Sequence, residues 1–86
     1  MKLKVLLFAY LKDKAGAREV EADVPAGASA GAVKARLGEL YPALRPSLDR
    51  ILMTVNKEFV SDEALIPEGA EIALFPPVSG GSGHGG

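Results

Sequence analysis

The stretch that decides the fold lies at the start of the chain, where residues 2–10 read KLKVLLFAY. A nearly continuous apolar run of this length is typical of a β-strand that is covered on both faces, or of one whose second face is kept for a partner. Side chains alternate along a strand, so two sets are expected to face opposite ways: Leu3, Val5, Leu7 and Ala9 on one side, and Leu6, Phe8 and Tyr10 on the other. Charge returns at Lys12 without an Ala-x-Ala cleavage pattern, so we interpret the run as a strand and not as a signal peptide.

The segments that follow predict a hairpin and then a helix. Residues 12–16 are polar and end in glycine, which indicates a hairpin loop. Residues 19–24 read EVEADV, and their acidic face is expected to meet water, which favours an edge strand. Ser29 is a candidate N-cap for a helix that Pro42 ends. Five apolar residues recur between them at helical spacing: Ala30, Val33, Leu37, Leu40 and Tyr41.

The second half of the chain predicts a loop and three short strands. Residues 43–50 read as a loop with one short turn that buries Leu44 and Leu48. Strands are expected at 51–55, from 59, and at 70–75, with turns at Asn56-Lys57 and Pro67-Glu68-Gly69. Within the helix, Gly38 is unfavourable by about 1 kcal/mol relative to alanine, and a close contact between helix and sheet would explain it.

This order of elements, β-β-α-β-β-β, predicts a two-layer α+β domain. We expect a mixed sheet of four to five strands with one main helix on one face. The first and last strands are the most apolar, so they should lie parallel at the centre of the sheet. This is the β-grasp arrangement of ubiquitin-like proteins. It is expected to occupy residues 1–78 and to be followed by a flexible glycine-rich tail, SGGSGHGG, at 79–86.

Composition excludes several classes of function. A chain of 86 residues has room for one domain, and its formal net charge of -1 without a basic stripe argues against binding to nucleic acid. The chain has no cysteine, which excludes thiolate metal sites and a cysteine nucleophile and fits a cytoplasmic location. No stretch is long enough to cross a bilayer, so no membrane association is expected.

Groups that could perform catalysis are scarce. His84 is the only histidine, and it lies in the glycine-rich tail with nothing to hold it. The carboxylate pair Asp62-Glu63 and the acidic face of residues 19–23 are explained by solvated surface. No nucleophile and base, metal site or tightly bound cofactor is expected, so the chain should not be an enzyme on its own.

The segment FPPVSGG at residues 75–81 carries the strongest functional signal. Its two prolines favour an extended path away from the domain, and glycine has no side chain, so its backbone can enter a narrow channel on another protein. A terminal glycine carboxylate is unhindered but a poor electrophile. Adenylation by ATP would turn it into a mixed anhydride that sulfur can attack, and the product would be a thiocarboxylate.

These residues resemble the small subunit of molybdopterin synthase, a sulfur carrier of the MoaD type. The resemblance covers residues 1–81 and rests on four segments: FPPVSGG at 75–81, KVLLFA at 4–9, Val55-Asn56, and EGAEI at 68–72. It implies that an E1-like enzyme adenylates the terminal glycine with ATP and that a sulfurtransferase system supplies the sulfur. The loaded carrier would then dock on the large synthase subunit and donate sulfur to the pyranopterin precursor in molybdenum cofactor biosynthesis.

The resemblance also implies a set of site residues. Gly81 would carry the thiocarboxylate, with Gly80 before it. The residues expected to contact the partner are Phe8, Phe59, Phe75, Pro76, Pro77 and Val78. The sequence supports an apolar docking surface independently, because one helix covers only one face of a sheet. The alternative is that the three phenylalanines belong to the core.

Two further alternatives stay open at this point. Five residues follow Gly81, and the chain ends in a second Gly-Gly, so the reactive residue is either Gly81 or Gly86. The carrier could also serve thiamine synthesis or tRNA thiolation, or the chain could be a ubiquitin-like modifier that forms isopeptide bonds with lysines.

Overall fold

The structure is a computed structural model that describes residues 1–77. Its strands are β1 (Lys2–Leu7), β2 (Glu19–Asp23), β3 (Leu52–Val55), β4 (Glu58–Val60) and β5 (Glu71–Phe75). Its helices are α1 (Tyr10–Ala15), α2 (Ala30–Leu40), the 3-10 helix η1 (Pro42–Leu44) and α3 (Arg45–Leu48). The predicted boundary between domain and tail, at residues 78 and 79, lies outside the described residues.

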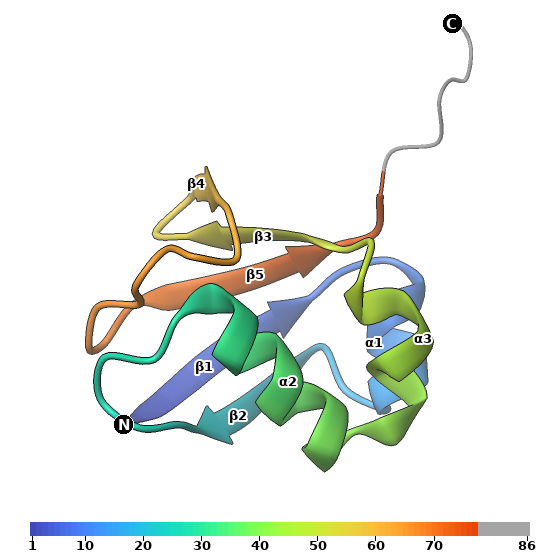
Figure 1. Cartoon of the computed structure of the whole chain (residues 1–86). Helices are drawn as coiled ribbons and strands as arrows, with labels where there is room; N and C mark the ends of the chain where they lie inside the picture. Colours follow the sequence, from blue (N-terminus) through green and yellow to red (C-terminus); the bar gives the residue numbers. More distant parts are fainter. Residues whose placement is uncertain (78–86) are drawn as a thin grey trace, which may run out of the picture.

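The five strands form one mixed sheet in the order β2-β1-β5-β3-β4. β1 pairs with β5 in parallel, so that Val5 lies opposite Ile72, while the other three pairings are antiparallel. The first and last strands therefore lie side by side within the sheet, and β2 is an edge strand, as predicted (Figure 1). The predicted β-grasp fold is confirmed.

α2 packs against one face of this sheet and closes the hydrophobic core (Figure 1). The side chains of Leu3, Val5 and Leu7 are buried beneath it, together with Val33 and Leu37 of the helix. Burying one such side chain contributes about 1.5–3 kcal/mol, so this layer is the main source of stability. The helix begins where predicted, because the Ser29 hydroxyl accepts a hydrogen bond of 3.2 Å from the Ala32 amide.

The predicted hairpin loop at 12–16 is wrong. β1 ends at Leu7, and residues 10–15 form the helix α1, which Gly16 ends in a left-handed conformation at φ 81°. The reason is burial: Leu11 lies on the inner side of α1 and is 1% exposed, so a helix hides an apolar residue that a tight turn would leave in water. The turn into α1 also removes Ala9 and Tyr10 from the strand faces that alternation assigned to them, and both are exposed.

The stretch at 43–50 also has more regular structure than predicted. η1 and α3 together span residues 42–48, and each has a proline in its first turn, where a missing amide and a fixed φ suit a helix. Leu44 is buried as expected, and Leu48 is half-buried. Leu40 was expected on the buried side of the long helix, but it lies in the last turn of α2 and is 39% exposed.

Gly38 is explained by a different neighbour from the one predicted. A Cβ atom built on Gly38 would lie 2.9 Å from Leu48 Cδ1 and 3.3 Å from Arg45 Cγ, both in α3 and neither in the sheet. The Arg45 Nε also donates a hydrogen bond of 2.9 Å to the Gly38 carbonyl. The glycine therefore allows α3 to approach α2 closely.

The predicted turn between β3 and β4 is confirmed. Asn56 and Lys57 have positive φ angles of 52° and 72°, the pair of left-handed residues that a two-residue hairpin turn requires. The Asn56 side chain accepts a hydrogen bond of 3.0 Å from the Glu71 amide, and its own amide donates one of 2.8 Å to the Glu71 carbonyl. Asn56 thus fixes the turn to the start of β5.

Candidate functional site

The sheet face opposite α2 is open, and its side chains follow from the register of the strands. Val5, Ile72 and Val55 point into the core, so their neighbours point the other way. Leu6 of β1 pairs with Ala73 of β5, and Ala73 in turn pairs with Thr54 of β3. Thr54 also lies opposite Phe59 of β4. The register therefore places a row of largely apolar side chains across four strands of the open face.

Three phenylalanines gather on this row, and we call Phe8, Phe59 and Phe75 the aromatic patch. The rings of Phe8 and Phe75 are stacked, with centroids 4.7 Å apart and an angle of 8° between their planes. Phe59 lies tilted against Phe75, at a centroid distance of 6.2 Å. Phe8 is 42% exposed and Phe59 is 69% exposed, so neither belongs to the core. The alternative of three core phenylalanines is therefore wrong.

A shallow hollow of about 310 Å³ lies within the aromatic patch. Its floor includes Thr54 and Ala73, which are buried although they lie on the open face. Lys57 and Glu71 also line it and bring charge to the patch. The sequence alone did not single out these four residues. They could have been identified if the strand order had been known, because the register of β5 between β1 and β3 places them beside the phenylalanines.

An unusual backbone conformation holds Phe8 in place. The next residue, Ala9, has φ 55° and ψ -136°, which L-residues rarely adopt and which costs on the order of 1–3 kcal/mol. On either side, the Phe8 amide donates to the Leu74 carbonyl at 3.3 Å, and the Phe8 carbonyl accepts from the Leu11 amide at 3.1 Å. These two bonds hold the strained corner and present the Phe8 ring to Phe75.

The segment that leads to the predicted tail begins at the aromatic patch. Phe75 is the last residue of β5, and it is followed by Pro76, which is half-buried, and Pro77, which is exposed. The other predicted site residues, Val78, Gly80, Gly81 and Gly86, lie outside the described residues, as does His84. The partner contacts and the reactive glycine therefore stay predictions, while the structure does bring Phe8, Phe59 and Phe75 together.

Some of the carboxylates that the sequence assigned to solvated surface form ion pairs there, among them Asp62 and Glu19. Asp62 accepts a 2.7 Å contact from Lys34, which ties the loop after β4 to α2. Glu19 lies 3.7 Å from Lys4, and both side chains are largely exposed. Within residues 1–77, no three His, Cys, Asp or Glu side chains are placed to hold a metal ion. In the same range, no helix is long and apolar enough to span a bilayer.

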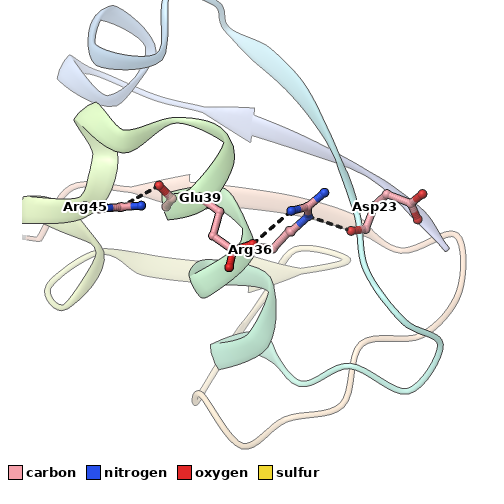
Figure 2. A network of polar contacts seen from close by, with 5 residues as sticks. Asp23, Arg36, Glu39 and Arg45 are labelled. Carbon is pink, nitrogen blue, oxygen red and sulfur yellow. Dashed lines mark hydrogen bonds and ion pairs between the residues drawn. The ribbon is translucent and has the colours of Figure 1, made fainter.

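Polar contacts on the other side of the sheet keep α2 in its place. Figure 2 shows Arg36 reaching from α2 to Asp23 at the end of β2, where its Nε donates to the Asp23 carbonyl at 3.2 Å. The same guanidinium contacts Glu39 one turn further along the helix, at 3.0 Å. These groups serve the packing of the helix layer and leave the open face free.

Comparison with known proteins gives one family. The profile of the ThiS family matches residues 5–81. The molybdopterin synthase sulfur carrier subunit of Dictyostelium discoideum is 37% identical over 81 residues, which cover 91% of this chain and 94% of that protein. Small archaeal modifier protein 1 of Haloferax volcanii is 37% identical over 83 residues, which cover 87% of this chain and 95% of that protein.

Solved structures agree with this result. A crystal structure of the Haloferax volcanii modifier protein has a TM-score of 0.84 at 35% identity and covers 94% of this chain and 100% of that one. A complex of subunits 1 and 2 of the molybdopterin-converting factor from Helicobacter pylori contains a chain with the same fold, at a TM-score of 0.66 and 21% identity. It covers 94% of this chain and 100% of that chain.

Proposed function

This chain belongs to the ThiS family of ubiquitin-like sulfur carriers, and we propose that it is the sulfur carrier subunit of a molybdopterin synthase. The observation that carries the proposal is the position of Phe75. This residue joins the aromatic patch, through its contacts with Phe8 and Phe59, to the Pro76-Pro77 step that leads to Gly80-Gly81. A partner that binds the patch is therefore placed where the tail starts, which is what a carrier with a reactive terminus needs.

The chemistry takes place at the terminal carboxylate. An adenylating enzyme joins this carboxylate to the α-phosphate of ATP, and pyrophosphate leaves. A hydrosulfide equivalent from a sulfurtransferase system then attacks the acyl carbon, and AMP leaves. One carboxylate oxygen has thus been exchanged for sulfur, and no electrons have been lost or gained. The thiocarboxylate sulfur forms a bond to the pyranopterin precursor, and water then cleaves the bond between this sulfur and the acyl carbon, so the carrier returns to a carboxylate.

The partners divide this work. The adenylating enzyme and the large synthase subunit each hold catalytic residues, and this chain provides the tail and the surface that orients it. The aromatic patch suits such a role, because exposed aromatic side chains are typical anchors at protein interfaces. The Helicobacter pylori complex of subunits 1 and 2 supports the existence of a large-subunit partner for a chain of this fold.

The test of the proposal is a single-turnover reaction with the large synthase subunit. The thiocarboxylated chain is mixed with the large subunit and cyclic pyranopterin monophosphate, and both product and carrier are followed by mass spectrometry. We expect a dithiolene product, with carrier returned to the carboxylate form in proportion to the sulfur transferred. A loaded carrier that keeps its sulfur in this mixture, yet loses it to a thiamine precursor or to tRNA, would contradict the assignment.

A second candidate function is protein modification. It is favoured by the likeness to the Haloferax volcanii modifier protein in sequence and in structure. In this case the activated glycine would be attacked by a lysine amine, and an isopeptide bond would form with loss of AMP. Adducts of this chain on lysines of other proteins, found by digestion and mass spectrometry after expression in a host with the adenylating enzyme, would establish this function.

A further inference from the structure

A second hollow adjoins the aromatic patch on the side of β2. It has a volume of about 380 Å³ and shares Leu6 and Phe8 with the first hollow. Its remaining lining consists of Leu7, Ala9, Lys12, Arg18 and Glu19. The apolar surface of the patch thus continues past Phe8 and ends at two cations, one from α1 and one from the segment that enters β2.

Neither cation is neutralised by an ion pair within residues 1–77. Lys12 and Arg18 are both exposed, and no carboxylate in this range lies within 4.0 Å of either charge. Glu19 lines the same hollow but pairs with Lys4, and Asp13 shares a third, more open hollow with both cations without forming an ion pair. Lys12 and Arg18 thus outnumber Glu19 in this hollow, although the whole chain carries a formal net charge of -1.

We propose that Lys12 and Arg18 form a cationic flank of the docking surface, and that this flank binds carboxylates on the large synthase subunit. The inference rests on the proposed function, since it concerns the same surface. A polar rim around an apolar centre is the usual anatomy of a protein interface, and the guanidinium of Arg18 can hold a carboxylate with two parallel hydrogen bonds. The partner therefore presents an apolar area facing Phe8 and acidic side chains beyond it.

The position of the flank gives it a function in docking. Lys12 and Arg18 lie beyond Phe8 on the β2 side of the patch, whereas Phe59 lies on its β4 side, with Phe75 and the start of the tail between them. A partner that meets both can bind in one orientation only. Charged groups at a rim also speed association, and that effect decreases with added salt.

The test compares three charge reversals of equal size. Arg18→Glu and Lys12→Glu change the flank, and Lys2→Glu is the matched control, because Lys2 is also exposed but lies at the far end of β1. Binding of each full chain to the purified large synthase subunit is measured by calorimetry at low and high salt, after thermal unfolding has shown that each variant folds. A fourth variant, Phe59→Asp, reports on the aromatic patch alone.

We expect each flank variant to bind about tenfold more weakly at low salt and to lose most of the salt dependence, while Lys2→Glu stays within about twofold of the wild type. If Phe59→Asp blocks binding but both flank variants bind as the wild type does, the flank proposal is wrong and the proposed function stands. A wild-type chain without affinity for the large subunit contradicts both. If the chain alone dimerises in sedimentation and Arg18→Glu abolishes the dimer, a second copy covers the flank and the proposal is wrong.

Discussion

At the scale of single residues, Phe75 connects the core of the fold with the aromatic patch, its proposed functional surface. Its backbone belongs to β5 and pairs with Leu52, while its ring lies on the open face between Phe8 and Phe59. The strained backbone at Ala9 also indicates that the position of the neighbouring Phe8 is fixed, because such strain persists only where the surrounding structure imposes it. The rings of Phe8 and Phe59 are exposed, so they can be changed without replacing a core residue.

The aromatic patch gives the first prediction. Phe8→Asp and Phe59→Asp should leave the domain folded, because both rings are exposed, and should weaken binding to the large synthase subunit by about 2 kcal/mol or more. Leu74→Asp is the control, since Leu74 is fully buried and an unpaired charge there should unfold the protein. Circular dichroism and calorimetry give the two readouts. Unfolding of Phe59→Asp would show that the ring is needed for the fold and would refute the prediction.

Gly38 gives the second prediction at this scale. Gly38→Ala should gain about 1 kcal/mol of helix propensity but lose a similar amount, because its Cβ would lie 2.9 Å from Leu48 Cδ1. Its net effect on the free energy of unfolding should be near zero. In a Leu48→Ala background the shortest contact is gone and only Arg45 Cγ stays close, at 3.3 Å, so the same change should stabilise the protein by up to about 1 kcal/mol. Chemical denaturation of the wild type, the two single variants and the double variant measures this coupling. Equal effects of Gly38→Ala in both backgrounds would mean that the contact with Leu48 does not offset the gain in helix propensity.

At the scale of elements, α1 is the part of the fold that the strand pattern concealed. It connects two antiparallel strands, a task that a two-residue turn could perform, and yet it adds Leu11 to the core. α1 also carries Lys12 and follows directly on Phe8 and Ala9, so it fixes one border of the proposed docking surface. The helix therefore has one side that packs on the core and another that faces the proposed docking surface.

The third prediction separates these two sides. Leu11→Ala should destabilise the protein by about 2–5 kcal/mol, because it leaves a cavity in the core. Lys12→Ala, one residue further on, should change stability by less than about 0.5 kcal/mol, because its side chain is exposed. Thermal unfolding monitored by circular dichroism measures both. A loss below about 1 kcal/mol for Leu11→Ala would mean that α1 is only loosely joined to the core.

At the scale of the whole molecule, the periodicity of apolar residues correctly predicted the sheet and the long helix. The alternation of Leu3, Val5 and Leu7 and the helical spacing of Val33 and Leu37 are set by burial, and burial can be inferred from the sequence. α1 and α3 were missed because each is shorter than two turns and has too few apolar residues to show a period. The neighbour of Gly38 was misassigned because a contact between two helices depends on tertiary packing.

The same distinction, between features that the sequence pattern reveals and features that depend on tertiary packing, applies to the site. The three phenylalanines could be named as a set from the resemblance to the sulfur carriers, and the single helix, which leaves one sheet face open, supported an apolar surface there. The Lys12 and Arg18 flank could not be predicted, since it requires α1 to end beside the entrance to β2. The reactive glycine is predicted from the sequence FPPVSGG and from the family, and its position sets the reach of the tail. An extended chain covers at most about 3.3–3.6 Å per residue, so the path from Phe75 to Gly81 could span at most roughly 20 Å, and the path to Gly86 roughly 17 Å more.

This difference in reach gives the fourth prediction, that Gly81 carries the sulfur. Reacting atoms must be held about 3–3.5 Å apart, so a channel built for the shorter tail cannot accept the longer one. The decisive measurement is intact-mass spectrometry after incubation with the cognate adenylating enzyme, ATP and a sulfur source, on chains that end at Gly80, Gly81 and Gly86. We predict that the chain ending at Gly81 is converted to the thiocarboxylate and that the chain ending at Gly80 is not. If, of the three chains, only the one ending at Gly86 is converted, and its sulfur is on Gly86, the prediction is contradicted.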